Sequence, residues 1–167
     1  MKAAVWHGRR DVRVENVSEP PPPPPGQVQV RVAWCGICGT DLHEYEGGPL
    51  YIPLERPHVL TGVQAPVIIG HEMSGEVTEV GEGVEDFVPG DRVAACPIIG
   101  CGQCRWCRSG SMAQCDRVAF LGTSWTGGAL ASVGTFAAPV GTRRPALRGV
   151  LSGGRSQLPT RRRQPLC

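Results

Sequence analysis

The chain has 167 residues, of which 41% are hydrophobic, and a formal net charge of +2. This length allows one domain with a modest core, and no apolar run approaches the roughly 20 residues that a membrane-spanning helix needs. The near-neutral charge hides an asymmetry, because all 15 acidic residues lie before residue 117, whereas residues 118–167 hold seven arginines and no acidic residue.

The N-terminal segment is polar and carries charge early. Its sequence, MKAAVWHGRRDVRVENV, lacks the apolar run of a secretory signal, so we expect a cytoplasmic location. In the reducing cytosol, eight cysteines are better interpreted as metal ligands than as disulfide partners.

The first third of the chain predicts strands. Residues 2–7 and 11–17 read as two short strands joined by a turn. Six consecutive prolines, at 20–25, then predict an extended connector, with a ligand segment for another protein as the less favoured alternative. Residues 27–35 alternate apolar and polar side chains over nine positions and are the clearest strand.

A short helix and a long loop are expected next. Thr40 or Asp41 can cap a helix that carries His43 and Tyr45. Residues 47–66 contain four prolines and little periodicity, which predicts a loop.

The middle of the chain predicts more strands and then a region without a core. Residues 67–69 lead into His71, residues 73–80 read as a strand, and residues 88–95 read as a turn followed by a strand. Glycine and cysteine dominate residues 97–116, which is typical of a metal-bound lobe.

The composition changes after about residue 128. Residues 142–167 are rich in Arg, Pro, Gly and Ser, and such a segment cannot bury enough apolar area to offset the entropy of ordering it. We therefore expect a domain over residues 1–128 and a disordered basic tail over residues 129–167. The abrupt change resembles the product of a shifted reading frame.

The tail also suggests an alternative function. Its seven arginines can contact nucleic acid phosphates without sequence preference, which would make the chain a zinc-stabilised binding module. The tail lacks interleaved aromatic residues and follows an acidic domain, so nucleic acid binding is not favoured.

Four cysteines have the spacing C-x2-C-x2-C-x7-C. Zn²⁺ prefers four thiolates in a tetrahedron, and gaps of two residues let neighbouring cysteines converge on one ion. Because four protein ligands leave no position for a substrate, the pattern predicts a structural zinc site, which contributes on the order of 10 kcal/mol to folding. Free or disulfide-bonded thiols and an iron–sulfur cluster are less favoured alternatives. The four residues are Cys101, Cys104, Cys107 and Cys115.

A second metal site is predicted around Cys38 and His71. A thiolate and an imidazole are ligands that an open, catalytic zinc site uses, and Glu72 is an occasional ligand or a close neighbour. Asp41 is a candidate to accept the other N–H of His71 and so fix its tautomer. Cys35 is the alternative source of the thiolate.

The stretch GHEMSGEVTEVGEGV, residues 70–84, matches every defined position of the zinc-containing alcohol dehydrogenase signature. Over roughly residues 1–128 the chain resembles the medium-chain dehydrogenase superfamily. The segments VAWCGICGTDLHEYEGGP and PHVLTGVQAPVIIGHE look most like the 2,3-butanediol dehydrogenase subgroup, to which sorbitol and threonine dehydrogenases are related.

The resemblance implies a fold and a site. The fold would be mainly β, a GroES-like, partly open β-barrel with short helices and a zinc-binding lobe. Cys38 and His71 would bind the catalytic zinc beside Glu72, Thr40 would contact the substrate alcohol, and His43 would end a proton relay. The cysteines at 101, 104, 107 and 115 fall where the family's structural zinc is bound.

The resemblance also implies an activity. Zinc and NAD(P) would interconvert a secondary alcohol or vicinal diol, of the 2,3-butanediol type, and its ketone. The partner would be this small molecule, with no membrane and no nucleic acid, and the oligomeric state stays open. A zinc-free quinone reductase of the same superfamily conflicts with the presence of both ligand sets.

The chain departs from the family after residue 128. It contains no G-x-G-x-x-G sequence and no βαβ pattern, so we expect the Rossmann domain that holds NAD(P) to be missing here. The family's third catalytic ligand has no counterpart, since no acidic residue follows Asp116 and Cys167 is interpreted as a bystander. We therefore expect an incomplete catalytic zinc site and a chain that is inactive alone.

Overall fold

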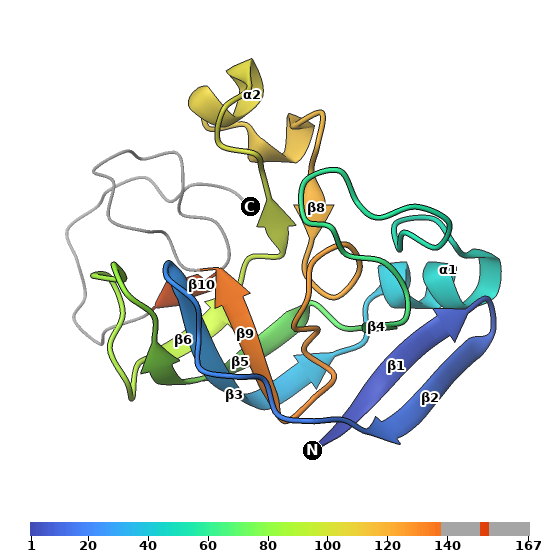
Figure 1. The fold of residues 1–167 in the computed structure, drawn as a ribbon, viewed down its shortest axis with the longest axis horizontal. Helices are drawn as coiled ribbons and strands as arrows, with labels where there is room; N and C mark the ends of the chain where they lie inside the picture. The colour runs from blue at the N-terminus through green and yellow to red at the C-terminus, as the bar shows by residue number, and fades with distance from the viewer. Residues whose placement is uncertain (138–150, 154–167) are drawn as a thin grey trace.

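A computed structural model describes residues 1–137 and 151–153 (Figure 1). Strands dominate this part of the chain and form a three-stranded, a five-stranded and a two-stranded sheet. The predicted mainly β class is therefore confirmed. Among the described residues, no helix is both long enough and apolar enough to cross a membrane.

The first sheet contains an N-terminal hairpin. Strands β1 (Lys2–Gly8) and β2 (Asp11–Asn16) pair antiparallel, as predicted, and β4 (Val67–Ile68) lies on the other side of β1. Trp6 of β1 is completely buried. It belongs to a small apolar cluster with Ile52, Val63, Val67 and Ile69.

The second sheet has the strand order β10-β6-β5-β3-β9. Its centre is formed by β3 (Gln27–Gly36) and β5 (Glu72–Val80), and β6 (Arg92–Ala95) pairs with β5. These strands match the predicted ones to within a few residues at each end. Their alternation sends one set of side chains inward, and the resulting main core includes Val28, Val30, Met73, Val77, Val93 and Leu121.

Strands are also present beyond residue 128, the predicted end of the domain. Strand β9 (Val133–Ala137) pairs with the edge of β3, and Phe136 is completely buried. Within the segment for which we expected disorder, β10 (Leu151–Gly153) pairs with β6. The seven tail arginines and Cys167 lie outside the described residues.

Helix α1 (Gly39–Gly47) confirms the predicted short helix but not its cap. The N-cap is Cys38, and Asp41 in the first turn accepts a 2.9 Å hydrogen bond from the Cys38 N–H. Cysteine is not a preferred capping residue, which is why the expected cap fell on Thr40 or Asp41. The backbone at the start of α1 is thus held by the side chain of Asp41.

The other end of α1 is held by the β1–β2 hairpin. The last carbonyls of a helix have no partner within the helix, and here the hairpin supplies donors. The Trp6 indole N–H donates to the Glu44 carbonyl at 3.2 Å, and the Arg9 Nε donates to the Glu46 carbonyl at 2.6 Å. The helix is therefore fixed against β1 at its C-terminal end.

Residues 97–121 form a lobe that extends away from the main sheet (Figure 1). It contains a short sheet of β7 (Ile98–Ile99) and β8 (Ala119–Phe120), the helical turn α2 (Arg105–Arg108) and the 3₁₀ helix η1 (Met112–Gln114). Few of its side chains join the main core, in agreement with the predicted lobe.

A loop was predicted over residues 47–66, and residues 48–66 contain no helix or strand, because α1 includes residue 47. This loop runs beside the lobe. The His58 ring accepts the Leu60 N–H at Nδ1, so Nε2 donates to the Val118 carbonyl at 3.1 Å. The Thr61 hydroxyl donates to the Ser124 carbonyl at 2.6 Å. These bonds fasten the loop to the segment that leaves the lobe.

The glycine at position 75 is required by the close pairing of β3 and β5. A Cβ atom there would lie 2.7 Å from Val30 Cγ1 and closer still to the Arg31 carbonyl oxygen. We predict that Gly75→Ala lowers the free energy of unfolding by about 1–3 kcal/mol, because overpacking forces backbone and side chains apart. Urea denaturation of the metal-loaded protein measures this.

The matched control is Gly8→Ala, since a Cβ atom at Gly8 would meet no atom within 4 Å. This variant is expected to stay within about 0.5 kcal/mol of the parent. Equal losses in both variants would contradict the close-packing explanation.

Candidate metal centres

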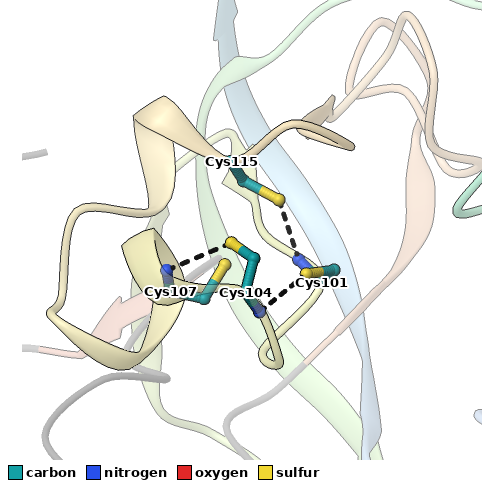
Figure 2. A group of neighbouring side chains, drawn as sticks. All are labelled: Cys101, Cys104, Cys107 and Cys115. Atoms are coloured by element: carbon teal, nitrogen blue, oxygen red, sulfur yellow. Dashed lines mark hydrogen bonds between the residues drawn. The ribbon is translucent and has the colours of Figure 1, made fainter.

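Four cysteine side chains converge in the lobe. The sulfur atoms of Cys101, Cys104, Cys107 and Cys115 all lie within 4.8 Å of one another, and Figure 2 shows the four side chains gathered around one region. Cys104 is the N-cap of α2, Cys107 lies inside α2, and Cys115 follows η1. None of the four forms a disulfide bond. The structure thus brings together the complete predicted set.

Backbone N–H groups point at these sulfur atoms. The N–H groups of Cys101, Cys104 and Cys107 donate to Cys115, Cys101 and Cys104 respectively, each at 3.4 Å. Hydrogen bonds to a sulfur favour its charged form. The backbone N–H groups of Gln103 and Cys104 accordingly lower the pKa of Cys101 to about 6.

Burial acts in the opposite direction on Cys107. This side chain is 1% exposed, and burial raises its pKa to about 12. Four thiolates within 4.8 Å would also repel one another. The group therefore holds all four charges only together with a cation, and a divalent ion that prefers tetrahedral thiolate ligands fits it.

A second group contains Cys38, His71 and Glu72, whose ligand atoms also lie within 4.8 Å of one another. Cys38 is the N-cap of α1, and Glu72 is the first residue of β5. Cys35 is not a member of the group among the described residues, and burial raises the pKa of its thiol to about 11. Of the two thiols, only that of Cys38 lies in this group of the described residues.

The position of His71 depends on the backbone just before it. Gly70 has a φ angle of +98°, which an L-residue with a side chain rarely adopts. The Ala129 N–H donates to the Gly70 carbonyl at 2.9 Å, and the Ile69 N–H donates to the Ala4 carbonyl at 3.1 Å. These bonds fix the turn between β4 and β5 from which His71 projects.

Asp41 and His71 face each other with unsatisfied atoms. The two side chains are 3% and 9% exposed, and Oδ1 of Asp41 lies 3.7 Å from Nδ1 of His71. Neither atom has a hydrogen-bond partner among the described residues, and the distance is too long for a hydrogen bond between them. The predicted pair is thus brought together without its bond, and unsatisfied buried polar atoms are typical of a site that lacks a ligand.

Thr40 and His43 both lie on α1. The Thr40 hydroxyl is 3.7 Å from the Cys38 sulfur, from which it accepts a hydrogen bond. His43 is exposed, and it shares a face of the helix with Thr40 because residues three apart do so.

Nothing in the residue pattern predicts one further feature of α1. Glu44 is only 1% exposed, although glutamate is almost never buried without partners. From the sequence alone, a glutamate on a short polar helix is expected to extend into solvent.

Comparison with known proteins gives a consistent picture. The family model described as the alcohol dehydrogenase GroES-like domain matches residues 24–143. The (R,R)-butanediol dehydrogenase of Bacillus subtilis is 49% identical over 128 residues, which are 77% of this chain and 36% of that protein. Sorbitol dehydrogenase of the same organism is 39% identical over 131 residues. The chain thus spans about a third of the length of these curated relatives.

Solved structures are similar as well. The crystal structure of 2R,3R-butanediol dehydrogenase from Bacillus subtilis superposes with a TM-score of 0.78 at 41% identity, covering 93% of this chain and 40% of that chain. A zinc-binding dehydrogenase from Sinorhizobium meliloti, solved with bound NADP, gives a TM-score of 0.68 at 33% identity, covering 81% of this chain and 36% of that chain.

The cysteine lobe generates a prediction about metal content. We expect the purified chain to retain one zinc ion after treatment with a chelator, because four thiolates hold Zn²⁺ tightly. Cys107→Ser should lose this ion and unfold the lobe, since the ion contributes on the order of 10 kcal/mol to folding it. Native mass spectrometry measures the retained metal.

The control for this prediction is Cys96→Ser, at a buried cysteine outside both groups. It should keep the chelator-resistant ion. Retention of that ion by Cys107→Ser would contradict the four-thiolate site.

Proposed function

The chain belongs to the family of alcohol dehydrogenase GroES-like domains, and we propose that it contributes the metal and substrate site for zinc-dependent alcohol oxidation. The reaction would be the NAD(P)-linked interconversion of a secondary alcohol or vicinal diol, of the 2,3-butanediol type, and its ketone. The observation that supports this most is the approach of the Cys38, His71 and Glu72 ligand atoms to within 4.8 Å. Family membership also confirms the predicted GroES-like fold.

Cys38 and His71 would hold the catalytic zinc, with Glu72 beside it. When bound there, zinc supplies a Lewis acid that lowers the pKa of an alcohol hydroxyl. Asp41 would orient His71 by accepting its Nδ1–H, which favours binding of metal at the other ring nitrogen. The two buried, unpartnered atoms of this pair support that role.

Thr40 and His43 would move the proton of the alcohol. The Thr40 hydroxyl is adjacent to the Cys38 sulfur and can accept a proton from a substrate bound there while passing its own onward. His43, one turn later and exposed, can take up this proton and release it to water. The hydride would leave to the nicotinamide ring of NAD(P).

The nicotinamide site is not assigned to any residue of this chain. The 167 residues contain no G-x-G-x-x-G sequence, and no third ligand to the catalytic zinc is assigned. We therefore propose that the 167-residue chain does not oxidise alcohols by itself. A cytoplasmic location is part of the proposal, because the cysteines of both metal groups must stay reduced to bind metal.

This proposal predicts the absence of turnover. The purified, zinc-loaded chain should form no NADH from NAD⁺ and 2,3-butanediol above a protein-free blank, because it has no G-x-G-x-x-G segment to hold the dinucleotide beside the metal. Absorbance of NADH is the measurement. A rate that scales with protein concentration would contradict this part of the proposal.

The substrate site generates a second prediction. In protein with Co²⁺ in place of zinc at Cys38, His71 and Glu72, adding 2,3-butanediol should shift the visible absorption, because an alcohol would enter the coordination sphere. Cys38→Ser should lack the shift, whereas Cys35→Ser should show it. An unchanged spectrum in the parent protein would argue against alcohol binding at this group.

A further inference from the structure

Glu44 is a buried carboxylate that the proposed reaction does not use. It lies in the second half of α1 and is 1% exposed. Burying a carboxylate is unfavourable unless hydrogen bonds compensate. Its partners therefore indicate what this side chain does.

The carboxylate accepts hydrogen bonds from three consecutive backbone N–H groups. The Leu50 N–H donates to both oxygens, at 3.0 Å to Oε2 and 3.2 Å to Oε1, and Oε1 also accepts from Tyr51 and, at 2.9 Å, from Ile52. The backbone carbonyl of Glu44 is engaged as well, by the Gly48 N–H at 3.0 Å and the Trp6 indole N–H at 3.2 Å. One residue thus binds the loop after α1 and strand β1 together.

The loop that Glu44 binds packs in the same apolar cluster as the residues just before His71. Ile52 is 2% exposed and packs in the apolar cluster with Trp6, Val67 and Ile69. Ile69 lies two residues before His71 in the sequence. At the other end of α1, Cys38 is the N-cap. Glu44 therefore connects α1, whose N-cap is Cys38, with the apolar cluster that precedes His71 in the chain.

We propose that Glu44 is a positioning residue for the metal group of Cys38, His71 and Glu72. By tying α1 to the loop at Leu50–Ile52, it fixes the separation between the Cys38 sulfur and the His71 imidazole. Glu44 itself does not join the ligand group. This inference rests on the proposed function, since it concerns the metal that the same group would bind.

A carboxylate is required because the loop offers only donors. Three N–H groups need acceptors, and an ionised carboxylate is acceptor-only, whereas a glutamine turns one NH₂ group toward them. Glu44→Gln keeps the shape of the side chain but places its NH₂ group against at least one of these N–H groups, so that two donors face each other. The loop would then move away from α1, and the two metal ligands on either side would lose their fixed separation.

The test is a Co²⁺ titration of the full chain, in which visible absorption distinguishes the two metal groups. Glu44→Gln should bind Co²⁺ at the Cys38 group about tenfold to 100-fold more weakly than the parent, the range typical when a residue that orients metal ligands is lost. Binding at the four-cysteine group should stay unchanged. The control is Glu46→Gln, an exposed glutamate on the same helix, which should match the parent at both groups.

A second variant decides the matter if Glu44→Gln does not fold. In Gly48→Ala, the new Cβ would lie 2.5 Å from Glu44 Oε2 and closer still to the Glu44 carbonyl oxygen, and so would disturb both the carboxylate and the backbone contacts of Glu44. It should weaken Co²⁺ binding at the Cys38 group in the same direction.

Three results would overturn the inference, and they differ from one another. Parent-like affinity at the Cys38 group in a folded variant would show that Glu44 only anchors the loop. Equal weakening at both groups would show a general loss of stability. Absence of any Co²⁺ at the Cys38 group in the parent would instead overturn the proposed function, and this inference with it.

Discussion

Mutual repulsion among closely placed ligand atoms is the constraint on which this structure depends. Four sulfur atoms lie within 4.8 Å of one another in the lobe, while burial opposes charge on Cys107 and backbone N–H groups favour charge on Cys101. These opposing effects are resolved when a divalent cation balances the thiolates. The lobe has little core of its own, so we propose that its folding requires such a cation.

The second group of ligands is assembled differently. Cys38 caps a helix, and His71 follows a tight turn between strands, so their approach depends on how α1 packs against β1 and the loop beyond it. Hydrogen bonds from Trp6 and Arg9 to the C-terminal end of α1 supply that packing, while Asp41 holds the backbone at the start of the helix. The site is therefore supported by the main domain, whereas the cysteine group supports its own lobe.

Most strands and the four-cysteine group could be predicted from the sequence, because alternation and residue spacing are local patterns. Alternation over residues 27–35 predicts β3, and the cysteine spacing predicts a group that the structure does bring together. Strand β9 was missed because it has only five residues and is too short to show a clear alternation, and it is stabilised by its pairing with β3. The cap at Cys38 was not predicted because cysteine is not a preferred capping residue. The burial of Glu44 depends on the course of the loop at Leu50–Ile52 and on the distant Trp6, which no local pattern encodes. The 3.7 Å gap between Asp41 and His71 is likewise a matter of tertiary geometry.

X-ray absorption spectroscopy of the zinc-loaded protein, before and after chelation, tests the central claim most directly. After chelation, the remaining zinc should show four sulfur neighbours at about 2.3 Å and no lighter ligand. Before chelation, the average should include nitrogen or oxygen neighbours at about 2.0–2.2 Å from the second group. A chelator-resistant zinc with nitrogen or oxygen ligands, or an average that chelation leaves unchanged, would contradict the division into one closed and one open metal site.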